Sequence, residues 1–386
     1  MAPRPAAHPA ANAETARPPK AAAADNPARK TARRSTRKPA HDGTDSRETA
    51  RLSDRINNNT LAIIAGELDS TDLTIVHELS AVLDDGDNLR ILPMVGAGGD
   101  RNIRDVRFMK GVDLGVTQSN LLGRMRQSSE IGPIDDKIVY LTKLFNEEMH
   151  LVVREDSPVT SIEQLAGRTV NLGEAGSGTR IVARDVFDRL GIAVREVNLT
   201  AREATERLRS GDIDASILIG GKPIPALSML PAGFRLVAVP FAKQLRDDFL
   251  PATLSNEDYP ALIEPGRRIE TLAVGTVLIA YNWPKDSDHY RKIEKFVAAF
   301  FPQVARLQAP PHHPKWREVN VAATLPGWAR FAAATDWLQQ HREVAENPRS
   351  QFDQFVAARS SPPASAEERE QLFREFLQWQ EVREPR

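Results

Sequence analysis

The sequence predicts an α/β protein with two lobes, each built on a mainly parallel sheet, followed by helices near the C-terminus. Two β-α-β series support this fold class, because strand patterns that alternate with helical ones are typical of parallel sheets with right-handed crossovers. Short apolar strand patterns lie at 60–65, 89–95, 112–117, 169–173, 194–199 and 213–219. Amphipathic helical patterns lie between them at 74–83, 102–110, 181–190 and 201–210.

Elements outside the two series complete the expected lobes. We expect further strands at 138–145, 149–154, 234–240 and 274–281, and short helical segments at 161–168 and 223–230. Apolar stripes predict C-terminal helices at 290–302, 329–344 and 365–382. The run at 274–281 follows a turn-rich passage, where a two-lobed chain would return to its first lobe. We therefore predict lobe one at 57–152, lobe two at 153–270, and the return to lobe one with the C-terminal helices at 271–386.

The first 56 residues differ in composition from the rest. The first 40 hold nine basic and two acidic residues, a net charge of +7, whereas the whole chain has 51 basic and 52 acidic residues, which leaves −8 for the remainder. We predict that 1–56 is a disordered basic segment rich in Ala and Pro, because it cannot bury enough apolar surface to offset its ordering entropy. It is a solvated linker or a basic arm for anionic lipid or nucleic acid. The acidic remainder should repel nucleic acid.

The residue types exclude several kinds of chemistry. The chain has no cysteine, which rules out thiol nucleophiles, disulfides and thiolate metal ligation. It has no apolar run long enough for a transmembrane helix, and no apolar core of a signal peptide is visible near its start. The histidines lack metal-ligand spacing, so we expect surface positions for His77, His150, His289, His312, His313 and His341. We expect no catalytic residues, no metal, no cofactor, and a monomer.

The most distinctive local pattern is Gly173-Glu-Ala-Gly-Ser-Gly-Thr179, which joins an expected strand to an expected helix. Glycines let the backbone approach a ligand, and the start of the helix presents unpaired N–H groups and a partial positive charge. Such a turn can bind an anion, although Ser177 and Thr179 could equally serve as helix caps. No lysine follows the glycines as in a P-loop, and the full dinucleotide-binding pattern is absent, so nucleotide hydrolysis is not expected.

Two further strand-end loops offer polar groups. The loop Gly66-Glu-Leu-Asp-Ser-Thr-Asp72 provides Ser70, Thr71 and Asp72 as ligand donors or as ordinary helix caps. Gln118-Ser119-Asn120 follows the strand pattern at 112–117. Loops at the carboxyl ends of parallel strands converge on one crevice, so we expect the three loops to meet at a ligand site.

Four ordered segments between 61 and 305 resemble the TAXI-type solute receptors of TRAP transporters, which are two-lobed proteins of the periplasmic-binding class. The most specific is 161–179, similar to the family's S-I-x-D-L-x-G-K-x-V-x-x-G-x-x-G-S-G-T segment. Residues 115–119 resemble its strand ending in Gln-Ser, and 210–215 resemble its G-x-I-D-A turn. Tyr259-Pro260 together with 271–280 resembles its Tyr-Pro and return-strand segment.

The resemblance implies a solute-binding receptor with a periplasmic-binding-protein-like fold, a ligand cleft between the lobes and a periplasmic location. Such a receptor captures a small organic molecule, here one that bears a carboxylate, and delivers it to TRAP-type permease subunits. The turn at 176–179 would contact the carboxylate, Gln118 and Ser119 would face it from lobe one, and Tyr259 would lie near the closing side. With the first loop included, the ligand-binding candidates are Gly66, Ser70, Thr71, Gln118, Ser119, Gly176, Ser177, Gly178, Thr179 and Tyr259.

The first loop departs from the family pattern. The family has a Gly-rich T-G-G-x-x-G-x-Y-Y segment there, whereas 65–72 is acidic and has no aromatic residue, and Asn120 stands where Asp is common. Glu67, Asp69 and Asp72 raise the cost of placing a carboxylate beside this loop. We therefore hypothesise a less acidic, amino-bearing or bulkier solute than the family's dicarboxylates.

A rival reading comes from a different class of function. The same two-lobed scaffold could carry an enzyme, or an intracellular or membrane-associated ligand-sensing domain, because a scaffold does not dictate function. An enzyme should place an acid/base pair with perturbed pKa values in its cleft, whereas a receptor should present neutral donors. We expect ligand binding rather than catalysis.

Overall fold

The computed structural model describes residues 43–86, 88–128, 130–341, 372 and 374. By compactness the chain divides into two units, Met1–Thr49 and Ala50–Arg386. The first unit is described only where helix α1 (Gly43–Asn59) begins. The expected disordered segment therefore gives way to helix over 43–56, while 1–42 lies outside the described residues. The physical reason is that no proline follows Pro39 until Pro93, and a helix interior does not tolerate proline.

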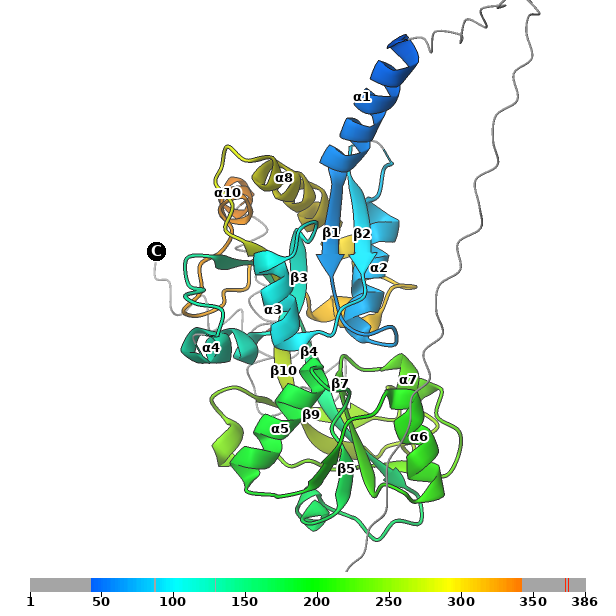
Figure 1. Ribbon diagram of the computed structural model, residues 1–386. Coiled ribbons are helices and arrows are strands. Elements are labelled where there is room, and N and C mark those ends of the chain that lie inside the picture. The colour runs from blue at the N-terminus through cyan, green and yellow to red at the C-terminus, as the bar shows by residue number, and fades with distance from the viewer. Residues whose placement is uncertain (1–42, 87, 129, 342–371, 373, 375–386) are drawn as a thin grey trace, which may run out of the picture. The chain divides into compact units, whose positions relative to one another are not determined.

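Ten strands form one sheet in the second unit (Figure 1). Its main path runs in the order β2 (Arg90–Met94), β1 (Thr60–Ile64), β3 (Leu114–Gln118), β10 (Arg268–Tyr281), β4 (Ile138–Arg154), β7 (Ala215–Gly220), β5 (Thr169–Asn171) and β6 (Arg195–Val197). Two strands lie off this path: β8 (Phe234–Val237) pairs with β4, and β9 (Leu250–Ser255) pairs with β10.

Parallel pairing is confined to the two ends of the sheet. At one end β1 is parallel to β2 and β3, and at the other β5 is parallel to β6 and β7. The central strands β4 and β10 are antiparallel to all their neighbours. The α/β class and both β-α-β series are confirmed. The sheet as a whole is mixed, because two long strands carry the chain from one parallel group to the other and back.

Helices connect the strands and cover the sheet. They are α2 (Thr71–Leu83), α3 (Gly99–Phe108), α4 (Ser119–Ser128), α5 (Gly178–Leu190), α6 (Ala201–Ser210), α7 (Pro225–Ser228), α8 (Asp288–Phe300), α9 (Val304–Leu307) and α10 (Ala332–Gln340), with 3-10 turns η1 (Ile162–Leu165), η2 (Lys243–Leu245), η3 (Phe301–Gln303) and η4 (Pro314–Glu318). Helix α4 and strand β9 were not predicted. The helix expected at 365–382 lies outside the described residues, apart from Leu372 and Arg374.

The apolar core follows the period-two alternation of the strands. In β1, Leu61 and Ile63 belong to the cluster that includes α2 and α8, whereas Ile64 belongs to the cluster that includes α3 and α4. That second cluster continues to α5, so apolar packing extends from the first parallel group to the second. A third cluster packs α6 and α7 with β8 and β9.

Strand β4 runs unbroken through 17 residues, although two strands were predicted there. The polar trio Asn146-Glu147-Glu148 suggested a break between apolar segments. The backbone nevertheless keeps its pairing, since Glu147 lies opposite Val274 of β10 and Glu148 lies opposite Gly220 of β7. Both glutamate side chains are buried, and their hydrogen bonds to other elements make this possible.

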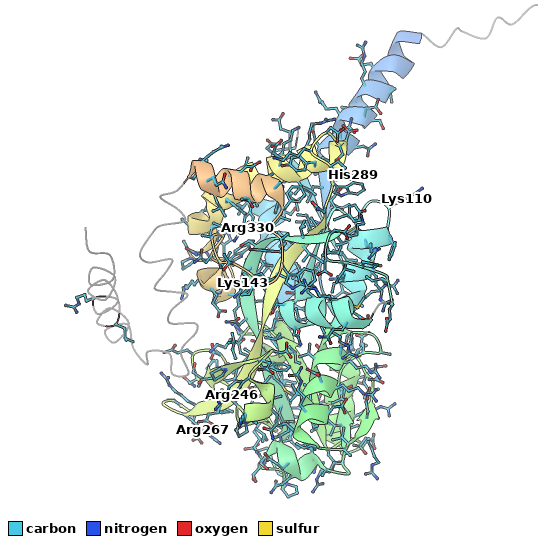
Figure 2. All side chains as sticks on the ribbon, turned by 90° about the vertical axis from the view of Figure 1, so that its left-hand side faces the viewer. Lys110, Lys143, Arg246, Arg267, His289 and Arg330 are labelled. Atoms are coloured by element: carbon cyan, nitrogen blue, oxygen red, sulfur yellow. The ribbon has the colours of Figure 1, made fainter. Side chains whose placement is uncertain are left out.

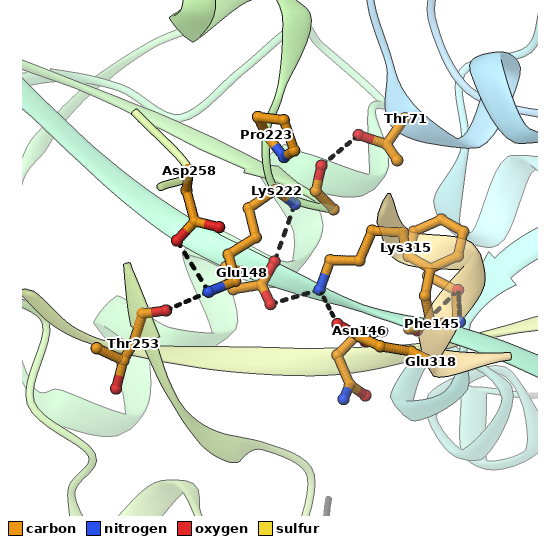
Figure 3. A network of polar contacts seen from close by, with 12 residues as sticks. Thr71, Phe145, Asn146, Glu148, Lys222, Pro223, Thr253, Asp258, Lys315 and Glu318 are labelled. Carbon is orange, nitrogen blue, oxygen red and sulfur yellow. Dashed lines mark hydrogen bonds and ion pairs between the residues drawn. The ribbon is translucent and has the colours of Figure 1, made fainter. Parts of the chain in front are cut away.

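Glu148 is the centre of a polar network that connects η4 to the sheet (Figure 3). Lys315 of η4 places its Nζ 2.6 Å from Glu148 Oε1 and 2.6 Å from Glu318 Oε1. The backbone N–H of Lys222, after β7, donates to Glu148 Oε2 at 3.1 Å, and its Nζ pairs with Asp258 at 3.0 Å. The network therefore joins charged groups from four segments: β4, η4, the residues after β7 and the residues after β9.

Lys315 carries the positive charge of this network in a place where water cannot stabilise it. It is 2% exposed, and burial by itself lowers its pKa, but Glu148 and Glu318 outweigh burial and raise the pKa above its ordinary value. A buried ion pair adds little net stability compared with an apolar pair, yet removal of one partner leaves the other charge uncompensated. The main role of Lys315 is thus to compensate the negative charges of Glu148 and Glu318.

We predict that Lys315→Met lowers the free energy of unfolding by about 3–5 kcal/mol, because Glu148 would remain buried without its cation. The loss should be larger at about pH 8 than at about pH 5, since protonation relieves an unpaired carboxylate. Urea unfolding followed by circular dichroism measures both effects. The matched control is Lys285→Met, which removes a lysine from an exposed ion pair with Asp336 and should change stability little. Equal effects of the two substitutions would contradict this account.

Candidate functional site

Loops from the two parallel groups meet at the carboxyl ends of their strands. The Gly178 N–H, at the start of α5, donates to the Ala97 carbonyl after β2 at 3.1 Å. Thr71, at the start of α2, donates its hydroxyl to the Gly221 carbonyl after β7 at 2.6 Å. The expected convergence of strand-end loops is therefore present, and the two groups touch through backbone atoms.

Glycines make the close approach possible. A Cβ at Gly99 would lie 2.8 Å from the Gly178 Cα, and a Cβ at Gly178 would lie 2.9 Å from the Gly99 nitrogen and from Gln118 Oε1. Gly99 also has φ +58°, a conformation that glycine adopts without strain. Any side chain at either position would separate the two loops.

The predicted turn at 173–179 opens α5 as expected, but its polar groups are largely engaged within the protein. Ser177 is buried and caps the helix, because its Oγ accepts the Arg180 N–H at 3.1 Å. The Gly178 amide is held by Ala97, and the Thr179 hydroxyl is 3.5 Å from the Ile219 carbonyl. Gly176 is exposed. The helix-cap interpretation of Ser177 is the one that the geometry supports.

The predicted residues of the first loop are also at the meeting point. Ser70 caps α2 by accepting the Leu73 N–H at 3.2 Å. Gly66 is buried, and a Cβ there would overlap the Ser70 side chain. Thr71 is buried and forms the bridge to Gly221. This loop therefore positions the start of α2 against the second parallel group.

Gln118 and Ser119 lie where β3 ends and α4 begins. Gln118 is 4% exposed, and its Nε2 donates to Glu147 Oε2 of β4 at 2.7 Å. Its Oε1 has no hydrogen-bond partner, and neither has Oδ1 of Asn120, two residues further along the chain. A Cβ at Gly275 of β10 would lie 3.5 Å from Ser119 Oγ, so this glycine leaves room beside the serine.

Asp72 and Glu147 are buried carboxyl groups at the same place, each 3% exposed. Burial raises the pKa of Asp72 to about 7. Burial, and then the charge of Asp72, raise the pKa of Glu147 well above its ordinary value. The neighbouring lysines are committed to other acids, Lys315 to Glu148 and Glu318, and Lys222 to Asp258. Within the described ranges neither Asp72 nor Glu147 forms an ion pair, although the charge of Lys315 partly lowers the pKa of Glu147.

A second pair of acids meets across the loops. Burial, and then the charge of Glu174, raise the pKa of Glu67 to about 7. Glu67 belongs to the loop after β1 and Glu174 to the loop after β5, so like charges face each other from the two parallel groups. The meeting point is therefore rich in acceptors and negative charge.

Tyr259 is not one of the residues that converge. It is 1% exposed in the third core cluster, where its hydroxyl accepts the Ile224 N–H at 2.9 Å and lies 2.9 Å from His150 Nε2. The surface position expected for His150 is wrong, because this side chain is fully buried and burial lowers its pKa to about 3. The pair fixes the loop after β7 from inside the core.

A separate set of polar contacts involves helix α8. His289, labelled in Figure 2, lies on α8 with Nδ1 3.1 Å from Asp113 Oδ1, and Lys292 is 3.2 Å from the same oxygen. Among the described residues no cluster of three or more His, Asp or Glu side chains could hold a metal ion. Across the same ranges no helix has the length and apolarity needed to cross a membrane.

Sequence reasoning missed the residues that give the site its charge. Glu147, Glu148 and Lys315 were not predicted, and Asp72 was considered only as a cap or ligand donor. One signal was available for the glutamates, because two acids inside an otherwise apolar strand pattern must be buried with partners if the strand continues. Nothing in the sequence places Lys315 beside them, since 167 residues separate it from Glu148.

The chain belongs to the NMT1-like family, whose model matches residues 70–321. Solved structures also show similarity. The periplasmic aliphatic sulphonate binding protein SsuA from Escherichia coli is 16% identical, with 84% of this chain and 94% of that chain covered and a TM-score of 0.38. A histidine-bound substrate binding protein of an ABC uptake transporter from Streptococcus pneumoniae is 12% identical, with 67% and 94% covered and a TM-score of 0.42.

We predict that the buried acids make the protein less stable as the pH rises from about 4 to about 8. Asp72 binds a proton in the folded state up to a pKa of about 7, against 3.8 for the ordinary group, so the folded state holds more protons in this range. Asp72→Asn should therefore gain stability relative to the wild type as the pH rises. Urea unfolding at several pH values measures the difference. Asp69→Asn, an exposed acid of the same loop, is the control and should show no such trend.

Proposed function

We propose that this protein is a solute receptor that binds a small organic molecule where the strand-end loops of the two parallel groups meet. The observation that carries the proposal is the direct contact between loops from both groups, at 97–99 with 178 and at 71 with 221. A molecule held there touches both groups at once, which couples binding to their separation. By resemblance the protein works in the periplasm and delivers its solute to a TRAP-type permease.

The contacts that would have to open in this mechanism are specific ones. To admit a solute, the hydrogen bonds Gly178–Ala97 and Thr71–Gly221 must open, and the packing of Gly99 against Gly178 must loosen. The strands β4 and β10, which join the groups, are continuous and can serve as the connection about which they move. Contacts to the solute would replace the lost contacts.

The carboxylate expected from the resemblance is not part of the proposed function. A carboxylate at the start of α5 would have to displace the Ala97 carbonyl from the Gly178 amide. It would also lie near Glu67 and Glu174, whose mutual repulsion contributes to the raised pKa of Glu67. Negative charges that interact with each other in this way also disfavour the binding of a further anion beside them.

A second candidate function rests on Asp72 and Glu147. Two adjacent buried carboxyl groups with raised pKa values are the feature expected of an enzyme that moves protons. Consumption of a bound compound during prolonged incubation, followed by nuclear magnetic resonance, would favour the enzyme. Recovery of the unchanged compound would favour the receptor.

We predict that a bound solute changes the distance between the two parallel groups. The chain has no cysteine, so Arg90→Cys with Arg202→Cys gives two unique labelling sites, one at the edge strand β2 and one on α6, both exposed. Electron spin resonance measures the distance distribution with and without a solute that raises the melting temperature. A distribution that does not respond to a stabilising solute would contradict the proposed mechanism.

We predict that Gly178→Ala weakens solute binding by about tenfold or more, because a Cβ at this position would lie 2.9 Å from Gln118 Oε1 and would displace a side chain that is a candidate for binding the solute. The matched control is Gly123→Ala in α4, where a Cβ meets open space. Thermal-shift titration of both variants gives the comparison. Equal affinity of both variants would show that the solute binds elsewhere.

A further inference from the structure

We propose that the site takes a solute with a cationic, hydrogen-donating group, an ammonium or amidinium, and that the carboxylates of Asp72 and Glu147 bind it together with the Gln118 side-chain oxygen. This inference rests on the proposed function and specifies its ligand. Two features support it: buried acceptor atoms without a hydrogen-bond partner, and two buried carboxyl groups that form no ion pair within the described residues.

The unpartnered atoms at the site are hydrogen-bond acceptors. Buried side-chain atoms without a partner include Asp72 Oδ1, Gln118 Oε1 and Asn120 Oδ1. Asp72 and Gln118 are more than nine-tenths buried. Gln118 has its Nε2 directed to Glu147, so the orientation of its amide leaves the oxygen free. A buried acceptor without a donor is costly, and a donor-rich ligand would remove that cost.

The charges at the site point to the same ligand class. Lys315 forms ion pairs with Glu148 and Glu318, whereas its effect on Glu147 is smaller than the effects of burial and of Asp72, which together raise the pKa of Glu147. Glu67 and Glu174 add negative charge from the opposing loops. An isolated buried carboxylate is unstable unless it is protonated or paired with a cation. An ammonium group supplies three donors and an amidinium a planar pair, which matches the acceptors available.

Binding of such a cation should release protons. The charged groups that act on Glu147 are Asp72, Glu148 and Lys315, and those that act on Glu148 next to it are Lys315, Glu318 and Lys222. Lys315 and Lys222 remain in their ion pairs, and His150 stays neutral because burial lowers its pKa to about 3. The protons therefore come from the raised carboxyl groups, and affinity for a cation falls as the pH drops below about 7.

The experiment uses the full-length protein and matched probes. Benzamidine is compared with its neutral analogue benzamide, and 1,4-diaminobutane and 4-aminobutanoate are compared with the dicarboxylate glutarate. Calorimetry at about pH 8 gives affinities, and buffers of different ionisation enthalpy give the number of protons released. Variants are Asp72→Asn and Glu147→Gln, with Asp69→Asn as the exposed acidic control.

The expected result is binding of amino or amidine probes, with protons released, and weak or no binding of benzamide and glutarate. Asp72→Asn and Glu147→Gln should each lower affinity about 10-fold to 100-fold while raising the melting temperature of the free protein, a combination that a purely structural role would not give. Glutarate binding that both variants leave unchanged would overturn the cationic ligand and leave the receptor intact. Failure of every cationic probe also overturns it. If no stabilising solute changes the distance between the spin labels at 90 and 202, the proposed receptor function is itself overturned.

Discussion

The charge balance of the Glu147-Glu148 dipeptide is the constraint on which the rest of the site depends. Both side chains are buried in the middle of a continuous strand, and Lys315 forms an ion pair with Glu148 but not with Glu147. Lys315 neutralises Glu148 and joins η4 to the sheet, but its second carboxylate partner is Glu318. Glu147 accepts a hydrogen bond from the neutral amide of Gln118, and Oδ1 of the neighbouring Asp72 has no hydrogen-bond partner. Lys315 therefore compensates the charge of one glutamate, and the other is the group to which we assign the proposed cationic ligand.

The topology of the sheet explains why this imbalance occurs at the meeting of the loops. Two parallel groups direct the carboxyl ends of their strands toward one place, and β4 passes between them. Helix α2 begins there as well, which brings Asp72 close to Glu147. The positive end of α2 offsets part of the cost of a carboxylate in its first turn. The remaining cost is the free energy that a cationic solute would recover.

Much of the fold could be predicted from local patterns, and the errors have physical causes. The strands of both β-α-β series and helix α6 lie close to their predicted bounds, because apolar periodicity and a capping box are local signals. The break predicted in β4 is absent, because distant partners satisfy the polar trio. The loops that form the candidate site were predicted from strand order. Tyr259 was selected by resemblance alone, and it lies in the core.

The sequence by itself determined the α/β class, the two β-α-β series, the absence of thiol chemistry and the acidic character of the loop at 65–72. These properties follow from residue types and short spacings. Only the tertiary structure decided which acids are neutralised and which are not. That outcome depends on a lysine 167 residues away from Glu148 and on a glutamine 29 residues away from Glu147. Electrostatic energy depends on distance in space, and local sequence carries no record of that distance.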